Sequence, residues 1–406
     1  MKVLIVGAGG QGGPCASILA RQNGISEIRL TDLDESVTKI VAEHIGSKKI
    51  ITGKVNATDP DDVARAAQGV DVVIDMVMPW MATYVMKGAL KAGAHYVNTA
   101  FDTPYWDEFI AGKSLEQLTL AKDFREAGLT ALLGCGMAPG FTNVIARYYA
   151  NKLDQVDSIK MRIGKANILP NEGKYDWLLK PWNPGWSPKQ ALIDCANPTY
   201  ALEDGKFVLY PPFGGIEECE FPEPIGTLAV THHSHEEIYS MPSTFKGLKE
   251  CDFKYYIMPQ PAMLYAMGLT SQEEIQVGAV KVKPIDVVAA VVPKPTSGLI
   301  GETAEKLAVA DQVNFFEMII KVSGTKDGAH RQYTVNCPKM NAPGPELLEI
   351  YGTSLVYVAL PASIGAMQII ENPIPGIIFA DQLDPDRFIE IMRETGYRYK
   401  WSVTES

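Results

Sequence analysis

The sequence predicts an α/β protein: a doubly wound parallel sheet, an inserted mixed α/β domain and a C-terminal helical return. Three observations support this. Six strand-like runs separated by helical patterns occur before residue 137, longer β-like runs replace that alternation after about residue 156, and the chain becomes helical again near its end. We expect a Rossmann domain over 1–145, a substrate and dimerisation domain over 146–340, and a segment over 341–406 that packs back on the first domain.

The first element is a buried strand followed by a glycine-rich turn and a helix. "KVLIVG" is the strand, and "GAGGQGG" leads into the helical pattern. Gly7 allows the tight turn, Gly9 lets the backbone approach a phosphate, and Gly12 lets helix and strand pack closely. Helix N-termini favour anions because their N–H groups are free. We expect a dinucleotide pyrophosphate here, held by Gly7, Gly9, Gly10, Gln11 and Gly12.

The second strand, "EIRLTD", ends in a carboxylate. Asp32 stands twenty residues after Gly12, where an acid can accept the ribose hydroxyls of an adenosine. A carboxylate there repels a 2′-phosphate, and the next lysine or arginine is Lys39. The sequence therefore favours NAD(H), with NADP(H) possible where the acid turns away.

The remaining strands of this sheet are expected in "KIITGKV", "VVIDMV", "HYVNTA" and "LTALLGCG". Ligands bind beyond the carboxyl ends of such strands, so the loops that follow them are the candidate site. Asp75, inside a strand, is expected to have a structural partner. We expect cofactor contacts from Met78, Pro79, Gly136 and Met137, and substrate contacts from Trp80 and Asn143. For Asn143, in the first turn of a helix, the alternative is a turn or capping role.

The loop after the fifth strand, "NTAFDTPYWDE", supplies two candidate catalytic residues, Asp102 and Tyr105. Asp102 has the charge to hold a substrate ammonium, and it is equally suited to cap a helix beginning near Pro104. Both interpretations stay open.

The middle of the chain carries a tryptophan-rich stretch, "YDWLLKPWNPGWSP". Such a stretch is expected to line a substrate pocket or a subunit contact. We expect Trp177 to contact substrate and Lys180 to bind a substrate carboxylate. Further on, Lys326-Asp327-Gly328 predicts a hairpin turn. The apolar stretch from residue 345 to 372 returns to the first domain or joins a dimer interface.

Composition excludes several classes. A net charge of −11 and a pI near 5.2 argue against nucleic-acid binding. No apolar run is long enough to span a membrane, and we expect a cytoplasmic protein. The six cysteines are scattered without metal-ligand spacing, so we expect reduced thiols and no metal site.

Several segments together resemble the saccharopine dehydrogenase (reductase-type) superfamily, which includes lysine 6-dehydrogenase and carboxynorspermidine dehydrogenase. These are "GALKAGAHYVNTAFDTP", "ALLGCGMAPGFTNVIA", "SHEEIYSMPSTFKGLKECDFKY", "GAVKVKPIDVVAAVVPKP" and "LPASIGAMQII". The resemblance covers nearly the whole chain in order. It implies hydride transfer between a nicotinamide and a carbon bonded to nitrogen, an amino acid or polyamine substrate, and a homodimer.

Two features of the resemblance point to different members. Ala138 stands where the saccharopine and carboxynorspermidine enzymes usually have an aspartate, as in the lysine 6-dehydrogenase pattern, whereas "SHEEIYSMPS" is closer to the polyamine-type members. Imine reduction and oxidative deamination of lysine both stay open. A non-catalytic dinucleotide sensor is the alternative from another class, because fold does not fix function.

Imine reduction needs a proton donor, and histidine is the usual one near neutral pH. The run "THHSHEE" holds His232, His233 and His235. Alternate positions on a strand put His233 and His235 on one face, and a solvated loop is the alternative. We expect His235 to be the proton donor, because it matches the histidine before two acids in polyamine-type relatives, and His233 to contact substrate.

Overall fold

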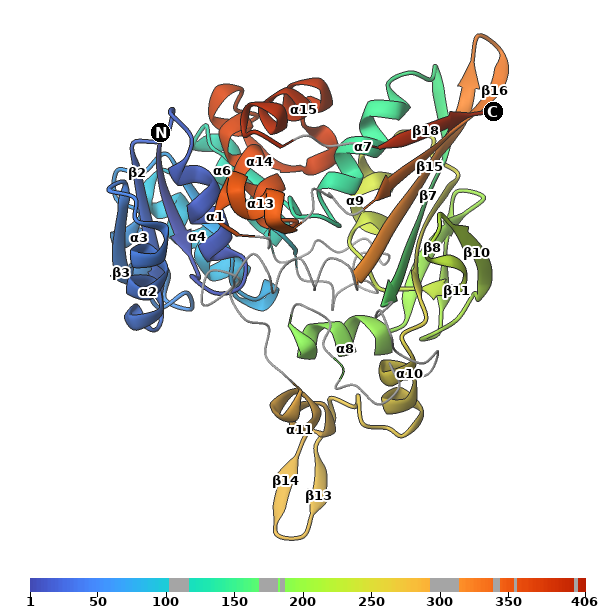
Figure 1. The fold of residues 1–406 in the computed structure, drawn as a ribbon, viewed down its shortest axis with the longest axis horizontal. Coiled ribbons are helices and arrows are strands. Elements are labelled where there is room, and N and C mark those ends of the chain that lie inside the picture. Colours follow the sequence, from blue (N-terminus) through green and yellow to red (C-terminus); the bar gives the residue numbers. More distant parts are fainter. Residues whose placement is uncertain are drawn as a thin grey trace.

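The computed structural model contains two large β-sheets with helices around them (Figure 1). It describes residues 1–101, 117–167, 182, 187–292, 314–338, 344–353, 356–397 and 401–406. The first sheet, with its blue N-terminal strands, lies at the left of Figure 1, and the second sheet lies at the right.

The first sheet is wholly parallel and has seven strands in the order β17-β6-β5-β4-β1-β2-β3. The doubly wound fold predicted from the sequence is confirmed. Its strands are β1 (Lys2–Val6), β2 (Glu27–Asp32), β3 (Ile50–Lys54), β4 (Val72–Asp75), β5 (His95–Asn98), β6 (Thr130–Leu133) and β17 (Gly376–Phe379). The central strands are apolar along almost their whole length, as expected where helices cover both faces.

Helices cover this sheet on both sides. Helix α1 packs against α2, α13 and α14, and α3 packs closely against α4. The helices are α1 (Gly12–Ala20), α2 (Glu35–Ile45), α3 (Pro60–Ala66), α4 (Ala82–Ala92), α6 (Ala121–Glu126), α7 (Phe141–Ala150), α13 (Gly344–Tyr351), α14 (Ala359–Glu371) and α15 (Pro385–Glu394), with 3₁₀ turns η1 (Pro79–Met81), η2 (Gln117–Leu120) and η4 (Ala380–Gln382).

The end of the chain returns to the first sheet, as predicted. Helix α14 packs against α1 and β5, and β17 pairs in parallel with β6 at the sheet edge. The small residues of α14 permit this close packing, since a Cβ on Gly365 would lie 2.7 Å from the Cys135 sulfur. The last strand departs from the expected organisation: β18 (Ser402–Glu405) pairs with the second sheet instead.

The second sheet is mixed and, in the described residues, has nine strands. Its main path is β10-β11-β12-β7-β15-β16-β18, and the hairpin of β8 and β9 attaches to β12. The strands other than β18 are β7 (Gln155–Asn167), β8 (Thr199–Glu203), β9 (Lys206–Tyr210), β10 (Glu217–Phe221), β11 (Gly226–His232), β12 (Glu250–Tyr256), β15 (Asn314–Lys326) and β16 (Ala329–Pro338). The predicted hairpin is confirmed, with Lys326 opposite Ala329 across the turn.

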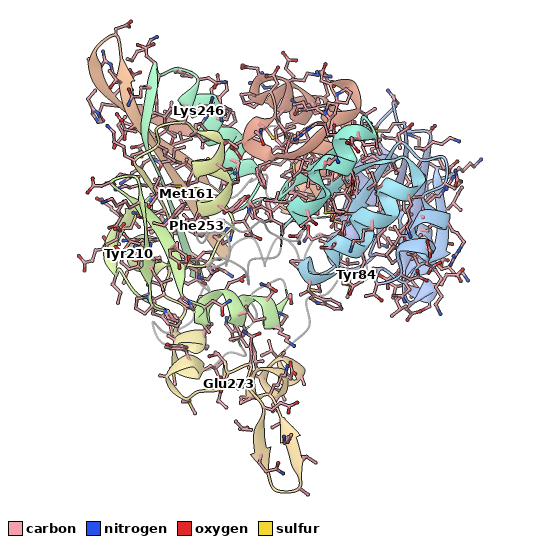
Figure 2. The ribbon with its side chains drawn as sticks, turned by 180° about the vertical axis from the view of Figure 1, so that it is seen from behind. Tyr84, Met161, Tyr210, Lys246, Phe253 and Glu273 are labelled. Atoms are coloured by element: carbon pink, nitrogen blue, oxygen red, sulfur yellow. The ribbon has the colours of Figure 1, made fainter. Side chains whose placement is uncertain are left out.

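Strand alternation gives this sheet two different sides. Met161 and Phe253, labelled in Figure 2, belong to the main hydrophobic core. Their neighbours Arg162 and Asp252 point to the opposite side, as the two-residue period of a strand requires. One side of β7 and β12 is therefore apolar and packed, and the other is charged.

Smaller elements complete the second half. Helices α8 (Pro188–Ala196), α9 (Glu237–Thr244), α10 (Pro259–Ala266) and α11 (Pro284–Val291) accompany the second sheet, and β13 (Ile275–Val277) pairs with β14 (Val280–Val282). That two-stranded hairpin projects away from the rest of the molecule (Figures 1 and 2).

Asp75 and the cysteines are buried in the way the sequence predicts. Asp75 has a structural partner, because the Tyr96 hydroxyl donates to its carboxylate at 2.6 Å. All six cysteines are buried thiols. Among the described helices, none has the length and apolar character needed to cross a membrane.

We predict that Gly88→Ala destabilises the protein. Alanine in place of glycine inside a helix normally stabilises by about 1 kcal/mol, but a Cβ at Gly88 of α4 would lie 2.5 Å from Val63 of α3. Overpacking of this kind costs about 1–3 kcal/mol, so the free energy of unfolding in guanidinium chloride should fall. Gly53→Ala is the control, because its Cβ would make an ordinary 3.4 Å contact with Thr31. Equal behaviour of the two variants would contradict close α3–α4 packing.

Candidate active site

The glycine-rich loop between β1 and α1 has the geometry of a phosphate cradle. Gly7 has φ +96°, and a Cβ on Gly12 would lie 1.7 Å from the Gly7 carbonyl oxygen. These two glycines are therefore required by the fold itself. Gly9 and Gly10 have no heavy atom within 4 Å of their Cβ positions. The space beside them, at the N-terminus of α1, fits a dinucleotide pyrophosphate.

Asp32 lies directly beside this loop. Its carboxylate accepts a hydrogen bond from the Ala8 amide at 2.8 Å and another from the Asp34 amide at 3.1 Å. This places the acid where the ribose of a dinucleotide would continue from the pyrophosphate.

Lys54 is a cation near Asp32 that the sequence did not reveal. It stands opposite Asp32 in the register of β2 and β3. Hydrogen bonds from Ser36, with a smaller contribution from Lys54, hold the pKa of Asp34 below its usual value. A positive charge is therefore present at the end of β2, which the spacing to Lys39 did not predict.

The loop after β4 joins the same edge of the sheet. Val77 lies against Gly7, with its side chain 3.0 Å from the Cβ position of that glycine. Met78 and Pro79 are half-buried, and Trp80 is 55% exposed. The start of this loop therefore adjoins the glycine-rich loop, the predicted cofactor residues Met78 and Pro79 follow it directly in the sequence, and Trp80 has a large exposed surface.

The loop after β6 is a compact turn. Phe141 donates its amide to the Gly136 carbonyl at 2.9 Å, and a Cβ on Gly140 would lie 2.1 Å from the same oxygen. Gly136 is buried and Met137 is half-buried. This tight turn starts α7 at the carboxyl edge of the sheet.

Asn143 is held inside the protein by its own hydrogen bonds. Its side-chain oxygen accepts from the Gly140 amide at 2.9 Å, and its nitrogen donates to Ser240 at 2.9 Å and to Asp381 at 3.2 Å. It is 1% exposed. These contacts favour the turn and capping role over the predicted substrate contact.

His235 lies just before α9, with its ring stacked on Phe253 at 4.0 Å between centroids. Its Nδ1 is 2.5 Å from one oxygen of Glu237, and the other oxygen accepts from the Thr142 hydroxyl of α7 at 2.8 Å. Burial alone would lower the pKa of His235, but the neighbouring acids, Glu237 first and then Glu236 and Asp194, outweigh it and raise that pKa to about 9. The imidazole is therefore protonated at neutral pH, and among the described residues Nε2 has no recorded hydrogen-bond partner.

Two more acids surround this histidine. Burial raises the pKa of Glu236 to about 8 and that of Asp194 to about 7, although the positive His235 opposes both shifts. Gln190 donates to Asp194 at 2.8 Å. Across the described ranges, no lysine or arginine pairs with either carboxyl group. The sequence reasoning missed Asp194 and Thr142, and its motif contained Glu236 and Glu237 without assigning them a role.

His233 is a neutral core residue. Strand β11 ends at His232, so His233 and His235 do not alternate on a strand, yet their ring centroids lie 6.0 Å apart. Burial and the neighbouring His235 lower the pKa of His233 to about 3. Only 6% of it is exposed, which leaves little surface for a substrate contact.

His235, Glu236 and Glu237 also bring three potential metal-ligand atoms within 4.8 Å of one another. However, both Glu237 oxygens accept hydrogen bonds, and the Nδ1 of a protonated His235 faces one of them. These groups suit a proton network better than a metal site, and the absence of a metal stays a prediction.

Asp102, Tyr105, Trp177 and Lys180 lie outside the described residues. Trp182 packs with Leu192 and Ile285.

The parallel sheet, the phosphate cradle and Asp32 define a protein that binds a nicotinamide dinucleotide. Family models match almost the entire chain: the saccharopine dehydrogenase NADP binding domain over residues 3–132 and the saccharopine dehydrogenase C-terminal domain over residues 136–397. The chain belongs to the saccharopine dehydrogenase family. It is an NAD(P)-dependent oxidoreductase that acts on carbon–nitrogen bonds, as the resemblance implied.

Two curated relatives match over nearly their full length. Carboxyaminopropylagmatine dehydrogenase of Synechocystis sp. is 26% identical, over 97% of this chain and 96% of the relative. Carboxynorspermidine synthase of Vibrio cholerae is also 26% identical, over 100% and 97%.

Solved structures share the fold. Saccharopine dehydrogenase (L-Glu forming) of Saccharomyces cerevisiae superposes with a TM-score of 0.68 at 14% identity, covering 99% of both chains. Homospermidine synthase of Legionella pneumophila, in complex with NAD, gives 0.66 at 15% identity, covering 99% of this chain and 91% of the other.

We predict that Gly9→Val removes cofactor binding without unfolding the protein. A valine side chain has room at Gly9 in the free protein, but it would occupy the space of the pyrophosphate, so the dissociation constant for NADH should rise at least about tenfold. Gly24→Val is the matched control, because its Cβ position is equally open. Fluorescence titration with NADH measures both, and unchanged affinity in Gly9→Val would remove the phosphate assignment.

Proposed function

We propose that the enzyme reduces an imine formed between a carbonyl compound and a polyamine-like amine or amino acid. Two relatives that match over full length carry names of this chemistry, carboxyaminopropylagmatine dehydrogenase and carboxynorspermidine synthase. The acidic surroundings of His235 are the observation that carries the proposal.

Within the described part of the chain this cluster holds one cation, His235, and three carboxyl groups, those of Asp194, Glu236 and Glu237. Burial raises the pKa values of Glu236 and Asp194, and the single positive charge of His235, whose Nδ1 lies 3.7 Å from Glu236, does not offset it. An ammonium group of the substrate would supply the missing charge and favour the ionised carboxylates. We therefore assign Asp194 and Glu236 to the amine end of the substrate.

In this proposal His235 supplies the proton. Carbonyl and amine first form a carbinolamine, and the protonated Nε2 of His235 donates to its hydroxyl group, which leaves as water. The bound nicotinamide dinucleotide provides the hydride that the iminium carbon accepts. The product is a secondary amine, and His235 recovers its proton from solvent. Glu237 keeps the imidazolium oriented through Nδ1, and Thr142 holds Glu237 in place.

We also propose NAD(H) as the preferred cofactor, with NADP(H) accepted. Asp32 supports the first, because its carboxylate beside the loop is suited to ribose hydroxyls. Lys54 supports the second, because it stands opposite Asp32 with a charge suited to a 2′-phosphate.

The remaining assignments are proposals too. We retain the domain limits 1–145, 146–340 and 341–406, and we place Asp102, Tyr105, Trp80, Trp177 and Lys180 at the substrate site. A homodimer fits the family resemblance. A cytoplasmic location is supported by six buried thiols, which a reducing compartment preserves.

The experiment that tests this function measures NADH and NADPH oxidation with aldehydes and 2-keto acids crossed with ammonia, lysine, ornithine and diamines, alongside the reverse assay of lysine with NAD. Consumption that requires both a carbonyl and an amine is the expected result. Activity with lysine and NAD alone would establish oxidative deamination, to which Ala138 points. Bound cofactor without turnover of any pair would favour the sensor hypothesis.

We predict that Glu237→Gln shifts the alkaline limb of the kcat–pH profile to lower pH. The limb should lie near pH 9 in the native enzyme, because activity is lost as His235 deprotonates. Without the carboxylate the pKa should move toward the ordinary histidine value of about 6.5, so kcat at pH 8 should fall roughly thirtyfold.

Glu218→Gln, on the exposed side of β10, is the control for this change and should keep the native profile. His235→Ala should lower kcat across the whole pH range. A native profile in Glu237→Gln would show that His235 is not the titrating group.

We predict opposite cofactor effects for Asp32→Ala and Lys54→Ala. The first removes a ribose acceptor, and KM for NADH should rise about tenfold, in line with one charge-assisted hydrogen bond. The second should raise KM for NADPH and leave KM for NADH unchanged. Lys48→Ala, an exposed lysine before β3, is the control. If each substitution changed KM for NADH and KM for NADPH equally, the result would show that these residues do not contact the ribose.

A further inference from the structure

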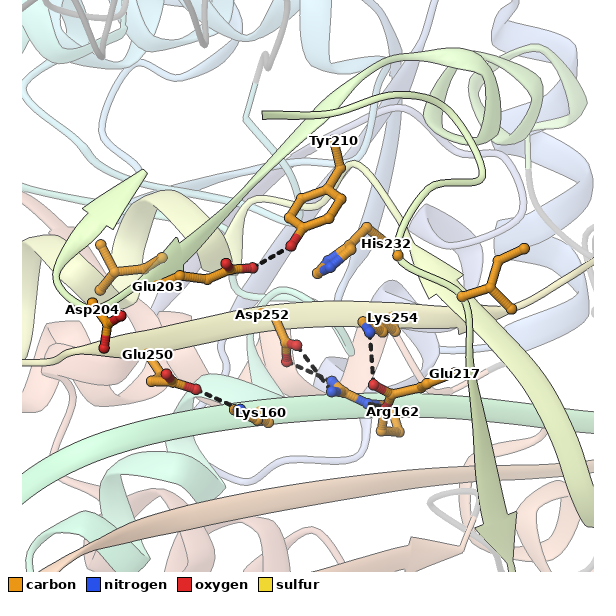
Figure 3. A pocket seen from close by; sticks show the side chains of 13 residues that line it. Lys160, Arg162, Glu203, Asp204, Tyr210, Glu217, His232, Glu250, Asp252 and Lys254 are labelled. Atoms are coloured by element: carbon orange, nitrogen blue, oxygen red, sulfur yellow. Dashed lines mark hydrogen bonds and ion pairs between the residues drawn. The ribbon is translucent and has the colours of Figure 1, made fainter. Parts of the chain in front are cut away.

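The charged side of the second sheet contains a cavity of about 380 Å³ (Figure 3). It lies on the Asp252 and Lys254 side of β12, whereas Phe253, the stacking partner of His235, faces the other way. The sheet therefore separates this cavity from the candidate active site. Its volume is within the range of small-molecule sites.

Every cation in the cavity wall already has a carboxylate partner. Arg162 donates to both oxygens of Asp252, at 2.5 and 2.9 Å, and to Glu217 at 2.5 Å. Lys254 donates to Glu217 at 2.7 Å, and Lys160 pairs with Glu250 at 2.5 Å. Figure 3 shows these pairs side by side. An anion entering the cavity would have to compete with carboxylates for each of them.

Two further carboxylates line the cavity, Glu203 and Asp204. Glu203 accepts a hydrogen bond from the Tyr210 hydroxyl, and neither acid pairs with a lysine or arginine within the described part of the chain. Among the described residues of the wall, five carboxylates against three cations leave two negative charges in excess. The wall is thus complementary to a ligand with two positive charges.

His232 adds an independent sign that a ligand is missing. It is 5% exposed and lines the cavity, yet its Nδ1 has no hydrogen-bond partner. One face of its ring stacks on Tyr210 at 3.9 Å, and its Cδ2–Nε2 edge lies against Gly215. Buried polar atoms are nearly always satisfied. Burial, with Lys254 adding to it, lowers the pKa of His232 to about 4, so the ring is neutral and does not repel a cation.

We propose that this cavity is a second binding site, for an aliphatic diamine or polyamine. One ammonium group donates to Glu203 beside the ring of His232, and the other lies among the acids near Asp204. A single metal ion fits less well, because calcium needs six to eight converging oxygens and three of the five carboxylates are engaged in ion pairs. The proposal stands on the cavity alone and does not require the catalytic assignment.

The test is equilibrium dialysis of radiolabelled 1,4-diaminobutane against the full-length protein. We expect saturable binding that Glu203→Gln/Asp204→Asn weakens at least tenfold. The amide that Glu203→Gln introduces keeps an acceptor for Tyr210, and asparagine tolerates the positive φ of +47° at Asp204. Glu218→Gln/Glu220→Gln, an equal loss of charge on exposed residues of β10, should bind as the native protein does.

Glu236→Gln distinguishes the catalytic site from the cavity. This substitution should alter KM for the amine substrate in the proposed reaction and leave diamine binding at the cavity unchanged. Equal binding by the two double variants would overturn the proposal. The proposal would also be overturned if calcium chloride or inorganic phosphate bound in a way that depends on Glu203 and Asp204 while the diamine did not bind. A loss of turnover in Glu236→Gln with cavity binding intact would separate the two sites.

Discussion

Two buried carboxylates hold together the parts of the chain that form the active site. Glu237 joins α9 to α7 through Thr142 and keeps His235 protonated, and Asp381 of η4 accepts hydrogen bonds from Asn143 of α7 and Thr244 of α9. A buried acid is costly without such partners. The position of the proposed proton donor therefore depends on the same contacts that seat the second half of the chain against the first.

The fold and the cofactor loop were predictable because their signals are local. Gly7, Gly9 and Gly12 form one turn, and the carboxylate of Asp32 follows at a fixed distance along the next strand. The network around His235 is not local: Thr142 and Glu237 are far apart in the sequence, and Asp194 lies on a separate helix. Lys54 meets Asp32 only through strand register. Periodicity within one segment does not encode such pairings.

The second sheet serves two different environments because its side chains alternate. Along β12, Phe253 supports His235 on the packed side, and Asp252 and Lys254 hold Arg162 and Glu217 on the other. A one-residue slip of this strand would exchange the two sets. The register of β12 therefore has to be defined strongly. The buried ion pairs between β7, β10 and β12 define it, because any other alignment would leave buried charges without partners.

Strand β17 completes the first sheet beside β6, although about 240 residues separate them. On a ribosome that adds 5–20 residues per second, roughly 10–50 s pass between the synthesis of β6 and that of its neighbour β17. During that interval the growing chain presents an unprotected strand edge, which is a template for pairing with other chains. Yield in the cell is thus set in part by how the nascent protein is shielded before its last tenth emerges, and shortened forms ending before Gly376 keep that edge open permanently.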